Sequence, residues 1–406
     1  MKRIIIYLTL IAALCVGNIS ARETAPTETS QDISKQKPRI QMAILLDTSG
    51  SMSGLINQAR TEVWTIVNEF ITAQKDGVSP EFELALYEYG KSSLAADEGY
   101  LRMIVPLTND LDLVSQELFA LATNGGQEYC GWVIQDAANQ LQWSQNPEDL
   151  KVIFVAGNEP FTQGPVSHKD ACRLSISKGI IVNTIHCGSE SDGVSGKWKD
   201  GAVLADGRFL NIDHNSRIAH IPAPQDEEIA RLGAELNTTY LAYGADGSAM
   251  LERQSAQDSL NSSAPAAKVQ RAVSKSSLYY DNARWDLVDA VEAEKVQLEN
   301  IDKDKLPEEM KNMNIEERKQ YVKENAEKRK ELQHKIKLLN QMRKDYIAQQ
   351  QKENAAANTL GSAIIEAVTS QAREKNFTFQ SAPAADENQQ PHSAEETNNP
   401  ISPKAD

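Results

Sequence analysis

Three oxygen-bearing residues stand close together at the end of the apolar run IQMAILLD. Asp47 ends this run, and Ser49 and Ser51 follow it at alternate positions. They would offer one carboxylate and two hydroxyl oxygens to one crevice, and hard divalent cations such as Mg²⁺ prefer oxygen ligands. The same residues would also suit an ordinary helix N-cap, because Ser and Asp side chains satisfy the free amides of a first helical turn. Since the run opens an alternation of strands and helices, we favour the cation site.

The elements that must position these residues form an alternating pattern. Apolar runs that are continuous rather than alternating indicate strands buried on both faces. These runs are IQMAILLD, FELALYEY, LRMIVPL, VIFVAG, IIVNTIHCG and TTYLAYG, of which the second and third form an edge hairpin or meander. Helical patterns lie between them, at about 55–73, 110–122 and 131–143. The sequence therefore predicts a doubly wound, mostly parallel α/β fold over residues 39–245.

A long insertion follows the run IIVNTIHCG. Residues 189–224 contain ADG between AVL and RFL, which is a hairpin turn signal. The insertion leaves the carboxyl end of a strand, and this is the edge at which α/β sheets bind ligands. We therefore expect it to shape the site and to select the ligand.

The segment AILLDTSGSM resembles the metal-ion-dependent adhesion site of a von Willebrand factor type A (VWA) domain. The resemblance covers roughly residues 39–245 and implies a mostly parallel sheet between two layers of helices. It also implies a divalent cation at the carboxyl edge of the sheet, held by Asp47, Ser49 and Ser51 and completed by an acidic group of the ligand. The expected cofactor is Mg²⁺, Ca²⁺ or Mn²⁺, and the expected partner is a protein that offers an acidic side chain.

Two positions depart from the pattern of this family. Where family members supply a threonine, this sequence has NGGQEYCG, and Glu128 is the nearest match. Where they supply the aspartate of a TDG segment, it has Gly157, with Asn158 and Glu159 beside it. Glu128 could replace the missing charge, and Asn158 could offer an amide oxygen. The predicted metal ligands are Asp47, Ser49, Ser51, Glu128 and Asn158. A weakened or empty site is the alternative.

Histidines and cysteines gather in one stretch of the sequence. Four of the six histidines lie there: His168, His186, His214 and His220. Imidazole and thiolate groups suit zinc, but no pair has the close spacing of a zinc motif, so we favour ordinary hydrogen-bonded histidines. His186 beside Cys187 could suggest a hydrolase or a thiol enzyme. Adjacent residues of a strand point to opposite faces, however, and we predict no enzymatic activity.

Three cysteines follow the N-terminal apolar segment: Cys130, Cys172 and Cys187. In an oxidising compartment one pair could form a disulfide, which would leave one thiol over. Cys172 with Cys187 is the pair that we favour. The alternative for each cysteine is a buried, unpaired thiol.

The first 38 residues predict export. Lys2 and Arg3, the apolar run after them and the small residues before Arg22 predict a signal peptide over residues 1–21. Leu14 before Cys15 makes lipid anchoring a poor alternative, because a small residue is wanted there. Polar residues without an apolar period predict a linker over 22–38.

The C-terminal third is unusually polar. Its composition predicts a flexible linker over 246–277, a helical region over 278–376 and a disordered tail over 377–406. Asn314 and Glu317 have the spacing of a capping box at the start of a long charged helix. Asn325, Arg329 and Arg343 interrupt its heptads, which favours a helical hairpin or a docked helix over a long dimeric coiled coil.

The overall charge argues against some classes of binding partner. Lys and Arg number 42 against 57 Asp and Glu, a net charge of −15, which argues against a general affinity for nucleic acid or anionic membranes. No later segment is apolar enough over a sufficient length to span a bilayer. We predict an exported protein-binding module, periplasmic or secreted, that engages its partner through the metal site. The alternative is a metal-independent scaffold in which the C-terminal helices make the contacts.

Overall fold

The computed structural model describes residues 37–215, 221–351 and 359–379. The predicted signal peptide, nearly all of the predicted linker 22–38 and most of the predicted tail 377–406 lie outside the described residues. Within the described ranges, no helix has both the length and the apolar character that crossing a membrane requires.

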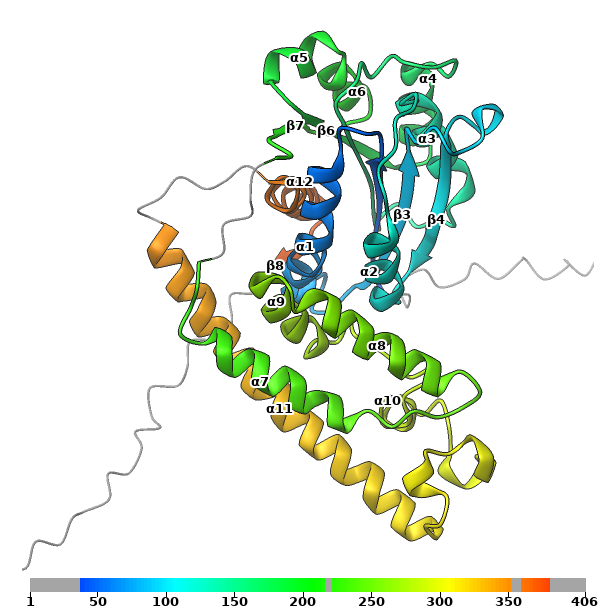
Figure 1. Ribbon diagram of the computed structural model, residues 1–406, viewed down its shortest axis with the longest axis vertical. Coiled ribbons are helices and arrows are strands. Elements are labelled where there is room, and N and C mark those ends of the chain that lie inside the picture. The colour runs from blue at the N-terminus through cyan, green and yellow to red at the C-terminus, as the bar shows by residue number, and fades with distance from the viewer. Residues whose placement is uncertain (1–36, 216–220, 352–358, 380–406) are drawn as a thin grey trace, which may run out of the picture. The chain divides into compact units, whose positions relative to one another are not determined.

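A six-stranded sheet forms the centre of the α/β part (Figure 1). Its strands, in spatial order, are β4 (Leu101–Thr108), β3 (Glu81–Tyr89), β1 (Arg39–Asp47), β5 (Leu150–Gly157), β6 (Ile181–Cys187) and β7 (Phe209–Ile212). Neighbouring strands are parallel except β3 and β4, which pair antiparallel at one edge. This topology confirms the predicted doubly wound, mostly parallel α/β fold with an antiparallel edge.

Helices cover both faces of the sheet (Figure 1). One layer holds α1 (Ser53–Glu69), α2 (Leu111–Ala120) and α12 (Leu360–Glu374), and the other holds α3 (Cys130–Gln140), α4 (His168–Ser177) and α6 (Trp198–Leu204). Ile44 and Leu46 of β1 face the first layer, whereas Ala43 and Leu45 face the second. Because both faces of β1 are buried, its sequence is an almost continuous apolar run.

Helix α12 belongs to the α/β part, although a long helical excursion precedes it. It packs on α1 and against β5, β6 and β7, and it places Ile364 in the apolar layer that α1 also forms. The carboxylate of Glu62 on α1 accepts hydrogen bonds from the amide of Gly361 (2.7 Å) and the hydroxyl of Thr359 (2.6 Å). The α/β domain that we predicted to end at residue 245 therefore closes only with α12.

A helical part lies between β7 and α12. It consists of α7 (Asp226–Leu236), α8 (Gly247–Asn261), α9 (Pro265–Lys275), α10 (Leu287–Glu292) and α11 (Ile315–Gln351). The predicted linker over 246–277 is wrong, because α8 and α9 occupy it. Pro265 stands in the first turn of α9, where its fixed φ suits a helix start. Val269 and Val273 then form a buried apolar face that the Ser, Ala and Gln composition concealed.

The predicted strand TTYLAYG is also wrong. The segment begins in a 3-10 turn at Asn237–Thr239 and forms only an isolated bridge between Ala242 and Asp286. Its apolar residues Tyr240 and Leu241 are buried among the helices instead of in the sheet. The run is apolar because it is buried, but it packs against helices and not against strands of the sheet.

The predicted hairpin around ADG does not form. AVL lies in α6, and RFL leads into β7, which pairs parallel with β6. The glycine of ADG lets two segments of backbone pass close together, and it does not form a hairpin turn. A Cβ on Gly207 would lie 1.9 Å from the carbonyl oxygen of Val182, so only glycine lets the chain pass β6 here.

The long helix α11 begins at the predicted capping box. The amide of Glu317 donates to Asn314 Oδ1 (3.0 Å), and the amide of Asn314 donates to the Glu317 carboxylate (2.8 Å). Further along, Leu332 and Ile336 are buried in a cluster formed with α7 and α9. The helix is therefore docked on other helices of its own chain.

Arg329 explains one interruption of the heptads in α11. Its guanidinium is buried and forms ion pairs with Asp286 (2.6 Å) and Asp289 (2.5 Å). It also lies over the ring of Tyr240, 4.3 Å from the ring centre. A charged residue at this position thus anchors α11 to the N-terminal end of α10.

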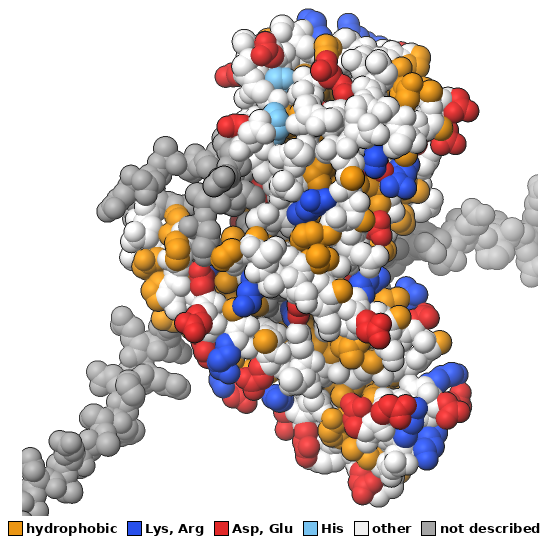
Figure 2. Space-filling view, viewed as in Figure 1, with side chains coloured by type: hydrophobic (Ala, Val, Ile, Leu, Met, Phe, Trp, Pro, Cys, Tyr) orange, Lys and Arg blue, Asp and Glu red, His pale blue; other side chains and the backbone are white. Residues whose placement is uncertain are grey.

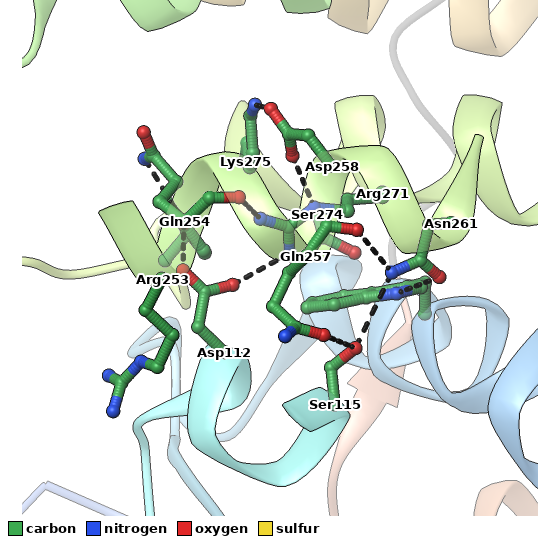
Figure 3. Close-up of polar contacts among 12 residues, drawn as sticks. Asp112, Ser115, Arg253, Gln254, Gln257, Asp258, Asn261, Arg271, Ser274 and Lys275 are labelled. Atoms are coloured by element: carbon green, nitrogen blue, oxygen red, sulfur yellow. Dashed lines mark hydrogen bonds and ion pairs between the residues drawn. The ribbon is translucent and has the colours of Figure 1, made fainter. Parts of the chain in front are cut away.

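A buried polar network joins α2 to α8 and α9 (Figure 3). Arg271 of α9 forms ion pairs with Asp112 of α2 (2.6 Å) and with Asp258 of α8. Lys275 pairs with the same Asp258 (2.7 Å), and the guanidinium of Arg271 lies over the ring of Trp64 on α1. Each buried charge has an opposite charge beside it, which a buried ion needs if it is to remain charged.

Replacement of Asp112 by alanine should destabilise the protein, because it leaves Arg271 short of a carboxylate partner in a buried position. Breaking a buried ion pair from one side typically costs about 3–5 kcal/mol, so the free energy of unfolding in urea should fall by that order. Glu227→Gln, which neutralises an exposed carboxylate of α7, is the control and should change stability by less than about 0.5 kcal/mol. A loss below about 1 kcal/mol in Asp112→Ala would contradict this account.

Candidate metal centre

The carboxyl ends of three adjacent strands build the candidate site. Asp47 ends β1, Gly90 directly follows β3, and Gly157 ends β5. Glu128 comes from the loop before α3, and Asn158 follows β5. Parallel strands bring these positions to one edge of the sheet, as the fold predicted.

Contacts show how closely the predicted residues meet. A Cβ on Gly90 would lie 2.8 Å from Asp47 Oδ1 and 2.8 Å from the Cγ of Glu128, so both side chains border this position. On the other side, Asn158 Nδ2 approaches the hydroxyl of Ser51 at 3.4 Å. The structure therefore brings the predicted ligands together at this edge.

The Asp47 carboxylate is held in a fixed position. It is fully buried, and its Oδ1 accepts a hydrogen bond from the amide of Ser49 at 2.7 Å. The next residue, Thr48, donates its amide to the carbonyl of Tyr89 and accepts from the amide of Asn124, both within 2.9 Å. The loop after β1 is thus tied to β3 and to the loop that carries Glu128.

Two glycines leave room for this carboxylate. Gly90 has a φ of 81°, which favours glycine, and any side chain there would collide with Asp47 and Glu128. A Cβ on Gly157 would lie 2.5 Å from the Tyr89 hydroxyl and 3.1 Å from Asp47 Oδ2. An aspartate at position 157 would therefore clash, which gives a physical reason for this departure from the family pattern.

Four buried oxygens at this edge have no hydrogen-bond partner among the described residues. They are Asp47 Oδ2, Ser49 Oγ, Glu128 Oε2 and Asn158 Oδ1. Buried polar atoms are nearly always paired, because leaving one unpaired costs about 1–3 kcal/mol, and more for a charged group. The arrangement therefore suits a ligand that accepts electron pairs from several oxygens at once.

The electrostatics of the site favour a positive ligand. Burial is the main cause that raises the pKa of Asp47 to about 7 and that of Glu128 to about 8. The charge of Glu159 raises both values further, and the charge of Asp47 raises that of Glu128. The nearby Ser49 opposes these effects at both carboxylates. A nearby cation favours the charged form of a carboxylate that would otherwise stay protonated.

The described histidines form ordinary hydrogen bonds, the interpretation that we favoured over a zinc site. His168 pairs with Asp200 at 3.2 Å, and His186 contacts Asn211 and the carbonyl of Asn158. His220 lies outside the described residues. Among the side chains that can be described, no three of the types His, Cys, Asp and Glu meet closely enough to hold a metal. A cation site at β1 must therefore use hydroxyl and amide oxygens beside its carboxylates.

The predicted disulfide between Cys172 and Cys187 is wrong. These two cysteines and Cys130 are free, buried thiols. Cys172 packs in the layer of α4, whereas Cys187 packs in the layer of α1 on the opposite face of the sheet. The sheet itself separates the two sulfur atoms.

The thiol-enzyme alternative also lacks support from the geometry. Burial raises the pKa of the Cys187 thiol well above its usual range, so the thiol stays protonated at neutral pH. Cys187 faces the layer of α1, whereas His186 contacts Asn158 and Asn211, so the imidazole is not placed to activate the sulfur.

Sequence reasoning missed the residues that support the site. Gln163 accepts a hydrogen bond from the amide of Glu128 at 2.6 Å and so positions its loop. Tyr89 donates its hydroxyl to the carbonyl of Ala156 at 2.9 Å behind Asp47. Gly90, described above, is the supporting residue that the sequence could have indicated, because a glycine directly after a buried strand commonly marks a close approach of backbone.

Comparison with known proteins yields likenesses of fold. No family model and no curated protein matches the sequence. Proximal thread matrix protein 1 from the mussel byssus, with a zinc-occupied MIDAS motif, is 14% identical, with a TM-score of 0.33 over 43% of this chain and 42% of that one. The conserved hypothetical protein BatB from Bacteroides thetaiotaomicron is 16% identical, with a TM-score of 0.33 over 44% of this chain and 91% of that one.

A third similar structure is the SpRpn10 VWA domain, at 17% identity and a TM-score of 0.31, over 45% of this chain and 100% of that domain. A VWA domain is thus among the solved structures that this chain resembles. The chain spans 41–46% of the length of the mussel thread matrix proteins.

Without a bound cation, the protein should lose stability as the pH rises from about 4 to about 8. The folded state holds protons on Asp47 and Glu128 up to pKa values of about 7 and 8, whereas the ordinary values are 3.8 and 4.5. The unfolded chain therefore releases these protons at lower pH, and raising the pH favours unfolding. Asp47→Asn, which keeps the size of the side chain, should weaken this dependence.

Urea unfolding in a chelator at pH 5, 6, 7 and 8 measures the effect. At pH 8 we expect Asp47→Asn to be more stable than the parent protein by on the order of 2–4 kcal/mol. At pH 5 the two proteins should differ little. Equal pH dependence in the parent and the variant would show that the Asp47 carboxylate is not protonated by burial.

Proposed function

We propose that this chain is a protein-interaction module whose α/β part holds a divalent cation at the carboxyl edge of its sheet. The observation that supports the proposal is the convergence of buried, unpartnered oxygens on Asp47, Ser49, Glu128 and Asn158. When bound, the cation would supply the positive charge that these groups lack and an attachment point for an oxygen of a partner.

The donors suit a hard ion. Asp47 would carry the main negative charge, Ser49 and Ser51 would offer hydroxyl oxygens, Glu128 would add a second carboxylate, and Asn158 an amide oxygen. All of these atoms are oxygens, which favours Mg²⁺, Ca²⁺ or Mn²⁺ over zinc, whose usual protein ligands include nitrogen and sulfur. The zinc seen in the mussel thread protein belongs to that protein.

The segment after β6 is placed to influence which partner binds. It contains α5 (Glu190–Ser195) and α6 and then reaches the start of α1. A Cβ on Gly54 would lie 2.3 Å from the carbonyl oxygen of His214, so the chain around His214 lies directly against the turn that follows Ser51. We propose that this part of the insertion 189–224 selects the partner.

We propose further that the protein is exported and works in the periplasm or outside the cell. Lys2, Arg3 and the apolar run that follows them support this part of the proposal. The three free thiols need no oxidising compartment, so they do not bear on it.

A metal-independent scaffold is the second candidate, and one surface favours it. Leu338 and Met342, one turn apart on α11, are 50% and 55% exposed. Figure 2 shows hydrophobic side chains at this end of α11, and it shows further hydrophobic side chains among charged ones of both signs over the rest of the helical part. Partner binding that survives loss of the cation but not Leu338→Glu would favour the scaffold.

Calorimetric titration of Mg²⁺, Mn²⁺ and Ca²⁺ into the full chain tests the proposed cation site. We expect one site, with an affinity that falls at least about tenfold in Asp47→Asn and in Glu128→Gln, because each variant removes a carboxylate from the donors without changing its size. Glu227→Gln on α7 is the matched control and should bind like the parent protein.

Two results would contradict the proposal. The first is no heat of binding for any of the three ions at millimolar concentration. The second is binding that Asp47→Asn and Glu128→Gln leave unchanged while both variants remain folded by circular dichroism.

A further inference from the structure

We propose that a pocket between the first turn of α2 and the segment 280–285 binds a small carboxylate that carries a compact apolar group. β4 begins beside the end of β3 and runs antiparallel to it, so α2 starts toward the amino edge of the sheet. The candidate metal centre lies at the carboxyl edge. The pocket is therefore a separate site, and the inference goes beyond the proposed function.

The pocket has a volume of about 170 Å³ and two kinds of wall. Met250 of α8 and Trp285 supply apolar surface, whereas Asn282 and Arg284 bring side chains that carry N–H donors. A cavity of roughly 150 Å³ is enough to hold a benzene molecule. The pocket therefore has room for a ligand with a single ring and a small polar group.

The aspartates that line the pocket already have partners of opposite charge. They pair as Asp110 with Arg253 (2.5 Å), Asp112 with Arg271 (2.6 Å) and Asp281 with Lys295 (3.5 Å). A positive ligand would have to compete with these cations of the chain itself. The lining carboxylates therefore do not favour an amine.

The amide of Asn282 is the neutral donor of the pocket. Its Oδ1 accepts a hydrogen bond from the indole of Trp285 at 3.1 Å, which fixes the orientation of the amide group. Its Nδ2 is buried and has no hydrogen-bond partner among the described residues. An amide nitrogen can only donate, and a buried donor without an acceptor costs about 1–3 kcal/mol. This atom therefore favours a ligand that accepts hydrogen bonds.

Arg284 is the charged donor. Its side chain is 76% exposed, and it reaches the carboxylate of Asp246, itself 67% exposed, only at 3.9 Å. An exposed ion pair of this kind contributes little, so the guanidinium is available to a carboxylate in the pocket. A bound carboxylate would thus meet the donors of Asn282 and Arg284, while its apolar group packs against Met250 and Trp285.

Calorimetric titration of benzoate into the full chain tests this inference. Benzyl alcohol and benzylamine serve as neutral and positive probes of similar size. All solutions contain a chelator, so that a carboxylate bound to a metal at the other edge of the sheet cannot contribute. We expect benzoate to bind with a dissociation constant on the order of 1 mM and at least about tenfold more tightly than the other two, because it alone has two acceptor oxygens and a charge opposite to that of Arg284.

Variants assign the binding to the pocket. Asn282→Asp keeps the acceptor for Trp285 but replaces the donor by a carboxylate oxygen, and Arg284→Gln removes the positive charge. Each should weaken benzoate binding at least about fivefold. Arg173→Gln, which changes an exposed arginine of α4, is the matched control and should bind like the parent protein.

Three results would overturn the inference. The first is no heat of binding with benzoate at about 10 mM. The second is binding of benzylamine or benzyl alcohol that equals that of benzoate. The third is benzoate binding that Arg284→Gln and Asn282→Asp leave unchanged while both variants remain folded by circular dichroism. None of these results bears on the proposed cation site, which the metal titrations test.

Discussion

The burial of one carboxylate, that of Asp47, is the constraint on which the rest of the site depends. The charge lies at the end of the central strand of a sheet that is covered on both faces. Its neighbours on both sides must then be small, and Gly90 and Gly157 stand there. One of its oxygens is satisfied by the amide of Ser49, and the other is left for a proton or a cation. The same atom would thus link the stability of the protein to the cation that we propose.

Buried charges elsewhere in the chain have partners of opposite charge, unlike the carboxylates of this site. Arg271 and Arg329 are both deeply buried, and each is surrounded by two carboxylates and lies over an aromatic ring. Arg271 attaches the helical part to α1 and α2, Arg329 attaches α11 to other residues of the helical part, and both charges are balanced within the chain. At the carboxyl edge of the sheet, no such cation from the described residues pairs with the carboxylates of Asp47 and Glu128. Balanced charges hold the structure together, whereas the carboxylates without a cation beside them lie where we propose that a divalent cation binds.

The sequence was informative where one local pattern decided the outcome. The continuous apolar runs predicted the sheet, and the motif at Asp47 predicted the edge at which Asp47, Glu128 and Asn158 come together. The spacing of Asn314 and Glu317 predicted the start of α11. Prediction failed where packing against distant parts of the chain decided the structure. TTYLAYG is apolar because helices bury it, and ADG contains a glycine because β6 passes close by. Composition also concealed α8 and α9, whose buried faces include arginine, lysine and glutamine. The reason for glycine at 157 depends on Tyr89, which no local pattern connects to it.

The return of α12 to the sheet has a consequence for how the chain folds. Glu62 on α1 receives its hydrogen bonds from Thr359 and Gly361, so the two elements that share this apolar layer are joined by contacts between residues 297 and 299 positions apart in the sequence. Until α12 arrives, Ile44, Leu46 and the inner face of α1 have an incomplete cover. Contacts between such distant segments form slowly, because the entropy of closing a long loop is lost before any of these contacts stabilises the chain. The sheet that carries the candidate site is therefore fully covered only after residues 360–374 have been synthesised, and a growing chain that lacks them still exposes part of its core.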